Sequence, residues 1–235
     1  DIHKKTDELT LDYLKNQNVI LILVESYMSL VSDMKVNKME ITPFLNTLKR
    51  DPVVYYNGHM KENVTIGESA DGQFIYMTGL LPLRSSITVS KARNIVLPKI
   101  AKMLERESRM IIPTKPTMWI QDEMCEQYGF DYLFTSKDIV GNSNDYLNDE
   151  QVFQLAMQKD KESHQPFFST ILTMSMHQPY TRQNDSTFLI NDKTIPHDLA
   201  CYLNACHYTD RQIKKYFEHL KQIGIYDNSI IVIAS

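Results

Sequence analysis

A short, wholly apolar stretch near the start of the chain constrains its fold more than any other feature. Residues 19–24 read Val-Ile-Leu-Ile-Leu-Val, with no polar position. Such a run is typical of a strand that is buried on both faces, as in a parallel sheet. A second apolar run, residues 230–234, lies at the other end of the chain. Helix-like segments lie between the two, and the pattern therefore favours an α/β protein.

Strand-like and helix-like segments alternate along the chain. The expected strands are residues 19–24, 53–56, 110–112, 132–134, 167–174 and 229–234. The expected helices are residues 42–48, 71–79, 94–107, 118–128, 148–157 and 199–223. Thr42 and Asn148 are expected to cap the start of a helix, and Gly129 and Gly224 to end one. The residues expected to face inward are Ile95, Ile100, Met103 and Leu104 on the third helix and Ile213, Phe217 and Leu220, which form a stripe on the last. This alternation predicts a mainly parallel sheet flanked by helices on both faces. Since no linker or repeat interrupts it, we expect residues 1–235 to form a single domain.

Composition and charge exclude several classes of function. With 25 Lys and Arg against 29 Asp and Glu, the net charge is −4, which gives no reason to expect a nucleic-acid partner. The longest apolar runs fall far short of the ~20 residues that cross a bilayer, and no secretory signal opens the chain. We expect the polar start at Asp1 to be a processed end or an artificial boundary. The 3 cysteines show neither disulfide nor zinc spacing.

Glu25 directly follows the first apolar run. Open α/β sheets bind their ligands beyond the carboxyl ends of the strands, which is where this carboxylate is expected. A hard divalent cation such as Mg²⁺ or Mn²⁺ prefers an oxygen ligand of this kind. The plainer interpretation is a solvated carboxylate where a buried strand reaches the surface, and position alone does not decide between the two.

Ser69 lies in the segment Gly-Glu-Ser-Ala-Asp, just before a helix-like stretch. The start of a helix presents unpaired N–H groups and the positive end of the dipole, which suits a phosphate or sulfate. A simple helix cap is the more common role of such a serine. Catalysis would need activation of the hydroxyl, and Asp71 stands where a serine-hydrolase elbow requires glycine. Metal coordination beside Glu25 is the alternative way to activate Ser69.

Two further side chains fall near expected strand ends. His177 follows the strand at 167–174, and Trp119, the only tryptophan, begins the helix after the strand at 110–112. A surface-loop histidine and a packed tryptophan are the plain interpretations. Three polar candidates at three strand ends nevertheless favour a shared site for Glu25, Ser69 and His177.

Eight short segments carry, in order, a resemblance to one known family. They are NVILILVESY (18–27), ITPFLNTL (41–48), GESADGQF (67–74), YGFDYLF (128–134), DEQVF (149–153), MSMHQPY (174–180), YTD (208–210) and IYDNSIIVI (225–233). The chain resembles the sulfatase-type branch of the alkaline phosphatase superfamily. Within that branch it is most similar to the extracytoplasmic domain of lipoteichoic acid synthase-like phosphoglycerol transferases.

The resemblance implies a role for several residues. Glu25 matches a metal-binding glutamate, and Ser69 matches the nucleophile, which is threonine in the well-known synthases and also ligates the metal. His177 matches a histidine that serves the substrate headgroup or proton transfer. Trp119 matches the tryptophan of a Trp-x-Arg substrate pair. Gln121 stands in place of that arginine, and an amide cannot supply the charged bidentate contact to a phosphate.

The resemblance also implies a reaction and a location. One divalent metal, Mn²⁺ or Mg²⁺, would serve the transfer of a phosphoglycerol group from a membrane lipid headgroup through a covalent phospho-serine at Ser69. In the family an Asp-His pair of metal ligands follows the last strand, so we expect it just beyond Ser235, and we expect the metal site of this chain to be incomplete. A membrane segment absent from this chain would hold the domain on the extracytoplasmic face of the bacterial cytoplasmic membrane.

Two alternatives to a phosphoglycerol transferase stay open, and a third is disfavoured. Another ester, such as phosphoethanolamine or a sulfate, would suit the same fold, although Ser69 lacks the Cys-x-Pro-x-Arg or Ser-x-Pro-x-Arg pattern of true sulfatases. A non-catalytic domain that binds an anionic headgroup is the second alternative, and metal retention would argue against it. A dinucleotide-binding domain is disfavoured, because residues 24–28 replace the glycine-rich turn that it requires.

Overall fold

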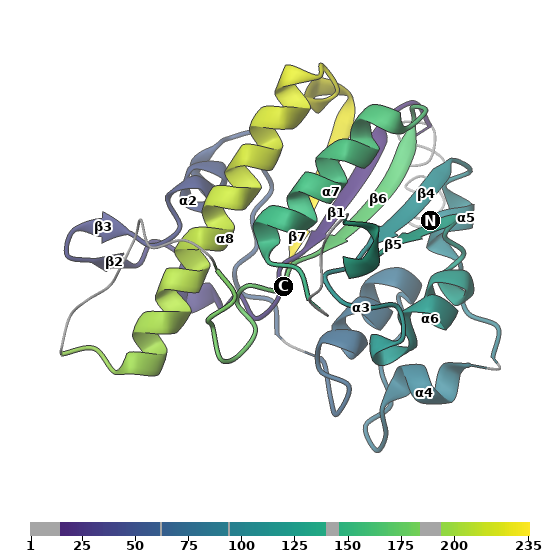
Figure 1. Cartoon of the computed structure of the whole chain (residues 1–235), viewed down its shortest axis with the longest axis horizontal. Coiled ribbons are helices and arrows are strands. Elements are labelled where there is room, and N and C mark those ends of the chain that lie inside the picture. Colours follow the sequence, from purple (N-terminus) through teal and green to yellow (C-terminus); the bar gives the residue numbers. More distant parts are fainter. Residues whose placement is uncertain (1–14, 62, 94, 140–145, 184–193) are drawn as a thin grey trace, which may run out of the picture.

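The computed structural model describes residues 15–61, 63–93, 95–139, 146–183 and 194–235, and it is built on one five-stranded sheet (Figure 1). The strands are β1 (Asn18–Leu23), β4 (Glu107–Ile111), β5 (Tyr132–Phe134), β6 (Phe167–Leu172) and β7 (Ser229–Ala234). They lie in the order β5-β4-β6-β1-β7, and every pairing is parallel. The predicted parallel sheet is therefore confirmed.

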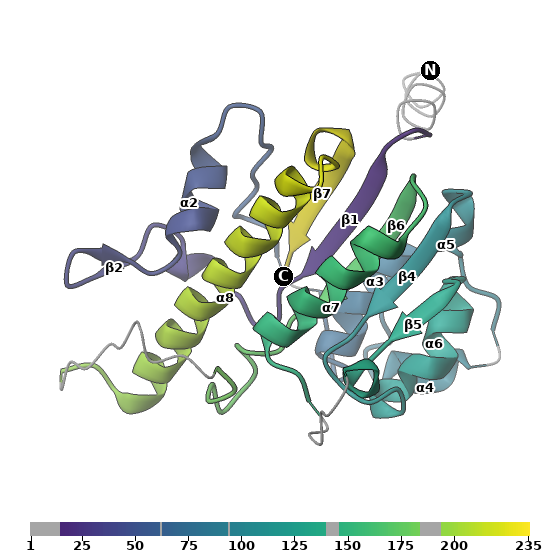
Figure 2. The same ribbon diagram turned by 45° about the horizontal axis from the view of Figure 1, so that its top comes forward.

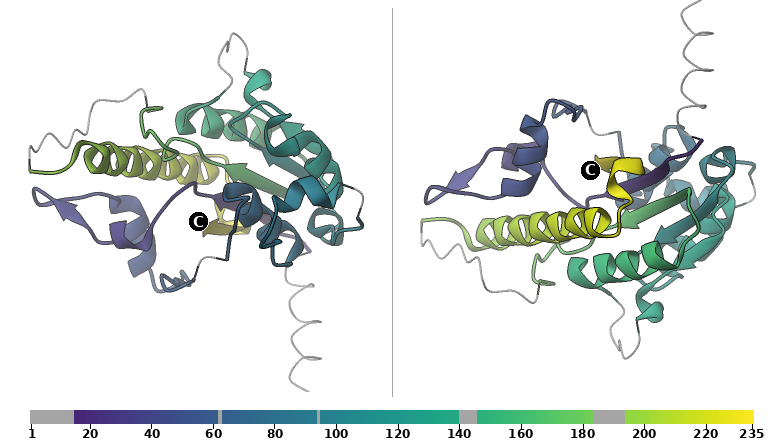
Figure 3. Two further views of the ribbon diagram at one scale, coloured as in Figure 1. Left: turned by 90° about the horizontal axis from the view of Figure 1, so that it is seen from below. Right: turned by 90° about the horizontal axis from the view of Figure 1, so that it is seen from above.

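Alternate side chains of β1 enter two separate cores. Ile20 and Ile22 pack under α7 (Asp149–Glu162) and α8 (His197–Gln222). Leu21 and Leu23 pack against the other layer. That layer contains α3 (Ser69–Thr78), α4 (Thr88–Ala92), α5 (Ile100–Met103) and α6 (Gln121–Tyr128). Figures 2 and 3 show the sheet between these two layers, as predicted for a strand buried on both faces.

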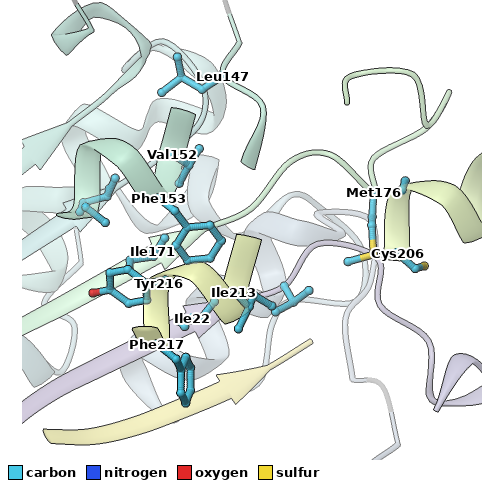
Figure 4. Close-up of a cluster of buried hydrophobic side chains, with 14 of the residues drawn as sticks. Ile22, Leu147, Val152, Phe153, Ile171, Met176, Cys206, Ile213, Tyr216 and Phe217 are labelled. Atoms are coloured by element: carbon cyan, nitrogen blue, oxygen red, sulfur yellow. The ribbon is translucent and has the colours of Figure 1, made fainter. Parts of the chain in front are cut away.

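The core beneath α7 and α8 is dense with aromatic side chains (Figure 4). Phe153 of α7 and Tyr216 of α8 lie with ring centroids 5.2 Å apart. Ile213, Phe217 and Leu220 of α8 are buried, which confirms the predicted apolar stripe on the longest helix. These contacts fix α7 and α8 against the face of the sheet.

Several element boundaries agree with local chemistry. The predicted strands at 132–134 and 229–234 coincide with β5 and β7. Asn148 caps α7 through a capping box with Gln151. Gly129 and Gly224 end α6 and α8 in the left-handed conformation, with φ of 83° and 74°, which glycine adopts without strain. These glycines end the two helices as predicted.

The predicted strand at 53–56 is wrong. Residues 52–54 form a turn and a bend, and residues 55–61 have no regular structure. Val53 and Tyr55 are 87% and 91% exposed. These residues have high β propensity, but no neighbouring strand pairs with them in the described structure, and propensity alone does not make a strand.

The predicted helix at 94–107 is also wrong for most of its length. Residue 94 lies outside the described residues, α5 covers only Ile100–Met103, and β4 already begins at Glu107. Pro98 precedes the short helix and cannot donate a backbone hydrogen bond. Ile95 lies before α5 in a stretch without helical structure, and Met103 is the last residue of that short helix; both are exposed rather than inward.

The N-terminus of α2 (Pro43–Arg50) is capped from a distance. Thr42 makes no side-chain capping bond, contrary to its predicted role. Asp210 of α8 instead accepts the N–H groups of Phe44 and Leu45 at 3.0 and 2.8 Å. This buried carboxylate therefore joins α2 to α8.

Small elements complete the described structure. They are the hairpin of β2 (Lys35–Val36) and β3 (Met39–Glu40), which sequence analysis did not predict, and the 3₁₀ helices η1 (Ser29–Val31), η2 (Met118–Ile120), η3 (Ser136–Asp138) and η4 (Tyr226–Asn228). The polar segment at residues 1–5 lies outside the described residues. Across the described part of the chain, no helix combines the length and apolar character needed to cross a membrane.

Candidate active site

The candidate site lies at the carboxyl end of β1, where the sheet changes the direction of its connections. Between β1 and β4 the chain passes through α2 to α3, and after β6 it enters α8; α3 and α8 cover opposite faces of the sheet. A crevice between adjacent strands of this kind is the usual ligand site of an open α/β sheet. The end of the chain lies at the same edge (Figure 1).

Glu25 and Ser69 meet at this edge of the sheet. The Ser69 hydroxyl donates a hydrogen bond of 2.9 Å to Oε1 of Glu25. The Ser26 hydroxyl donates to the same oxygen, also at 2.9 Å. Two of the predicted site residues, 44 positions apart in the sequence, are thus in direct contact.

The backbone around Glu25 is held by three hydrogen bonds to the ends of β6 and β7. Its N–H donates to the hydroxyl of Thr173, just after β6, at 2.9 Å. The N–H of Val24 donates to the carbonyl of Ala234 in β7 at 2.7 Å, and the N–H of Tyr27 donates to the hydroxyl of Ser235 at 3.1 Å. The carboxylate therefore leaves a rigid central strand rather than a free loop.

The turn before Ser69 is folded around Asp71. The carboxylate oxygen Oδ2 of Asp71 accepts the N–H groups of Thr65 and Gly67 at 3.0 and 3.1 Å and the Thr65 hydroxyl at 2.7 Å. Burial alone would raise the pKa of Asp71, but these hydrogen bonds and one from Thr88 outweigh it and hold the pKa below its ordinary value. Asp71 is therefore a charged anchor for the serine turn.

Ser69 opens α3 directly after a strained residue. Glu68 has a φ of 46°, which is uncommon for any residue other than glycine. The N–H groups of Ala70 and Asp71 donate to the carbonyls of Gly67 and Glu68 at 2.9 and 3.0 Å. These two donors are already used within the turn, so the helix start offers an anion fewer free donors than the sequence suggests.

The side-chain oxygens of Glu25 and Ser69 are spaced as two adjacent ligands of a small divalent cation would be. Adjacent oxygen ligands of Mg²⁺ at about 2.1 Å in octahedral geometry lie roughly 3 Å apart, close to the 2.9 Å seen here. Both are oxygen donors, as a hard cation requires. Among the residues that the structure describes, no group of three or more His, Cys, Asp or Glu side chains is arranged to hold a metal.

His177 lies in an exposed turn after β6 and is not bonded to the pair. Its Nδ1 lies 2.7 Å from the carbonyl oxygen of Gln178. The residues before it are fixed by Asp149, whose Oδ1 accepts the N–H groups of Met174 and Ser175 at 2.7 and 2.9 Å. His177 is therefore carried on the same edge as Glu25, on a loop that begins at a buried anchor.

Trp119 and Gln121 occupy different environments. Trp119 is 37% exposed and has a φ of 50°. Gln121 is buried, and its amide Nε2 donates to Oε1 of Gln73 at 2.7 Å. The structure brings neither of these predicted substrate residues into a described hydrogen bond with Ser69.

Sequence analysis did not assign the anchoring roles of Asp71, Asp149 and Gln73. A signal existed only for Asp71, because an aspartate two residues after a helix-opening serine can fold back onto the turn. The partners of Asp149 and Gln73 lie 25 or more positions away in the sequence, so no local pattern exposes these roles.

Comparison with known families is decisive at this point. The sulfatase family model matches residues 17–235, almost the whole chain. The chain belongs to the sulfatase family. This confirms the resemblance seen in the order of the short sequence segments.

Relatives of this sulfatase-family chain include lipoteichoic acid synthases. It is 30% identical to lipoteichoic acid synthase 2 of Bacillus subtilis over 229 residues, which cover 93% of this chain and 35% of that protein. The chain thus spans about a third of that relative's length.

Solved structures show the same fold. The lipoteichoic acid synthase LtaP of Listeria monocytogenes matches with a TM-score of 0.83 at 22% identity, covering 94% of this chain and 57% of that one. The Streptococcus pyogenes phosphoglycerol transferase GacH, solved with sn-glycerol-1-phosphate, matches with a TM-score of 0.73 at 20% identity, covering 98% and 65%.

Proposed function

We propose that this chain carries the nucleophile side of a metal-dependent phosphoglycerol transferase that acts on a membrane lipid headgroup. The observation that supports it most is the 2.9 Å contact between the Ser69 hydroxyl and Glu25, at the strand edge where such sheets bind ligands. The synthases and the phosphoglycerol transferase among its relatives support the same reaction class.

In this proposal Ser69 is the nucleophile. Its hydroxyl releases its proton to solvent, and the oxygen then forms a bond to phosphorus while the bond from phosphorus to the lipid oxygen breaks, which gives a phospho-serine ester. Glu25 and Ser69 would hold a Mn²⁺ or Mg²⁺ ion, which lowers the pKa of a bound hydroxyl and offsets phosphate charge. His177 would give a proton to the departing lipid oxygen and then take one from a second alcohol, whose oxygen bonds to phosphorus as the bond from phosphorus to Ser69 breaks.

The remaining parts of the proposal concern substrate and place. Trp119 would form a wall for the headgroup, near Gln121. A lipid substrate requires access to a membrane, so we place the domain on the extracytoplasmic face of the bacterial cytoplasmic membrane, held by a segment outside this chain.

The test is the intact mass of a version extended past Ser235 through the expected Asp-His pair, after incubation with Mn²⁺ and phosphatidylglycerol. We expect an adduct the size of a glycerophosphate group, located at Ser69 by peptide mapping and lost in Ser69→Ala. Ser26→Ala is the matched control, because Ser26 donates to the same Glu25 oxygen at the same distance and should leave the adduct intact. A folded protein that binds Mn²⁺ but forms no adduct would sink the phosphatidylglycerol assignment. Incubation with phosphatidylethanolamine then tests the alternative headgroup.

A further inference from the structure

Two successive residues beside the candidate site have a strained backbone. Trp119 and Ile120 have φ values of 50° and 51°. A positive φ is a marked outlier for isoleucine, whose branched Cβ crowds the backbone. Strain of this kind persists only where the surrounding structure holds it, and it is concentrated at functional sites. Trp119 is also the only tryptophan of the chain and remains 37% exposed.

A buried amide pair lies directly after this strained segment. Gln121 donates through Nε2 to Oε1 of Gln73 at 2.7 Å, and each glutamine is 4% exposed. The Oε1 atom of Gln121 is buried and accepts no hydrogen bond from the described residues. A buried polar side chain is costly when unpaired, so loss of either partner would leave the other unsatisfied.

The same pair reaches the helix of the nucleophile. Gln73 follows Ser69 by four positions in α3, so the two side chains lie on the same face, one turn apart. Gln121 is the first residue of α6 and directly follows Ile120. One hydrogen bond therefore connects the segment that carries Trp119 to the helix that carries Ser69.

We propose that Gln73 and Gln121 are positioning residues that fix the Trp119 side chain relative to Ser69. Both glutamines are uncharged, so the pair orients Trp119 without placing a positively charged side chain beside it. The part of the proposal that concerns substrate rests on the proposed function, whereas the positioning of Trp119 does not.

The test uses the fluorescence of Trp119, which is the only tryptophan and reports on its own surroundings. Acrylamide quenching is measured for the wild type, Gln73→Met, Gln121→Met and the double variant. We expect each single variant to make Trp119 more accessible to acrylamide, and the double variant to add little more, because both remove one shared bond. Gln212→Met is the matched control: Gln212 is equally buried but lies in α8, and its variant should leave quenching unchanged.

A second measurement addresses the substrate. Titration with sn-glycerol-1-phosphate in the presence of Mn²⁺ is followed by the same fluorescence, and loss of one orienting bond should weaken binding by about fivefold. If the wild type shows no binding but quenching changes as expected, the proposed function fails and the positioning role stands.

Unchanged quenching in folded Gln73→Met and Gln121→Met proteins would overturn the proposal. So would an equal change in Gln212→Met, since that would indicate a general loss of packing. If the methionine variants do not fold, Gln73→Asn and Gln121→Asn shorten the side chains by one methylene and break the same bond. The same expectations and the same contrary results then apply.

Discussion

Gly67 and Asp71 lie so close that a Cβ atom added to Gly67 would sit 2.3 Å from Oδ1 of Asp71. The carboxylate cannot swing away freely, because its other oxygen holds the N–H groups of Thr65 and Gly67. The turn that presents Ser69 thus requires both a residue without a side chain and a charged anchor.

Gly67→Ala should destabilise the protein and disturb the Ser69 turn. The new methyl group would push Asp71 off its hydrogen bonds, at a cost of about 1–3 kcal/mol in the free energy of unfolding. Urea unfolding measures this cost.

Gly72→Ala is the control for that substitution. A Cβ at Gly72 would meet only Val64 Cγ1 at 3.6 Å, and Gly72 lies inside α3, so alanine there should stabilise the protein by up to about 1 kcal/mol. Equal effects of the two substitutions would contradict the anchoring role of Asp71.

Glu25→Gln should weaken Mn²⁺ binding by at least about tenfold, because the amide keeps the shape of the side chain but removes the charge that attracts the cation. Electron paramagnetic resonance of free Mn²⁺ gives the affinity. Glu68→Gln removes an equal charge from an exposed side chain beside Ser69 and should change the affinity little. Similar losses in both variants would show that general charge, and not ligation, governs binding.

Asp210 should make stability fall as the pH rises. Burial raises the pKa of this carboxyl to about 6, against an ordinary value of 3.8. The folded state therefore keeps a proton between pH 4 and 6 that the unfolded state has released. This contribution to stability is complete below pH 4 and lost above pH 6, and amounts to about 3 kcal/mol.

Asp210→Asn removes that titration and should flatten the difference between urea unfolding at pH 4 and at pH 7 by about that amount. Asp122→Asn, at an exposed position of α6, should leave the pH dependence as in the wild type. A wild-type pH dependence in Asp210→Asn would mean that another group is responsible.

Arg109 and Asp160 form a buried ion pair in which Nη2 lies 2.5 Å from Oδ1. Arg109→Met alone should cost about 3–5 kcal/mol, since it leaves a buried carboxylate without its partner. The double variant Arg109→Met/Asp160→Met should recover most of that loss in urea unfolding.

The exposed pair of Arg93 and Glu123, 3.0 Å apart, is the comparison, and Arg93→Met should cost less than about 1 kcal/mol. Additive losses in the buried double variant would refute this account.

The sequence was most informative where the signal is local. An unbroken apolar run predicts β1, a glycine in the left-handed conformation ends α6, and a capping box starts α7. The order of the strands also placed Glu25 and Ser69 at one edge, and the structure shows them in contact. The strand, the helix end and the cap each depend on residues within a few positions of one another, whereas the Glu25–Ser69 contact follows from the order of the predicted elements.

The predictions from the sequence were wrong where residues far away along the chain determine the local structure. Residues 53–56 have the composition of a strand but find no partner, and Thr42 precedes a helix that Asp210 caps from 166 positions away. The Gln73–Gln121 bond likewise joins two helices that no periodicity relates. Packing of remote segments therefore overrode local preference in each case.

The place of β1 between two strands from the second half of the chain has a consequence for synthesis. Its two neighbours are β6 and β7, and the bond from Glu25 to Thr173 alone spans 148 positions. At about 5–20 residues per second, roughly 7–30 s separate the translation of these two residues. During that time an apolar hexapeptide is without the strands that pair with it, so the nascent chain needs either non-native contacts or a chaperone before the edge that carries Glu25 can form.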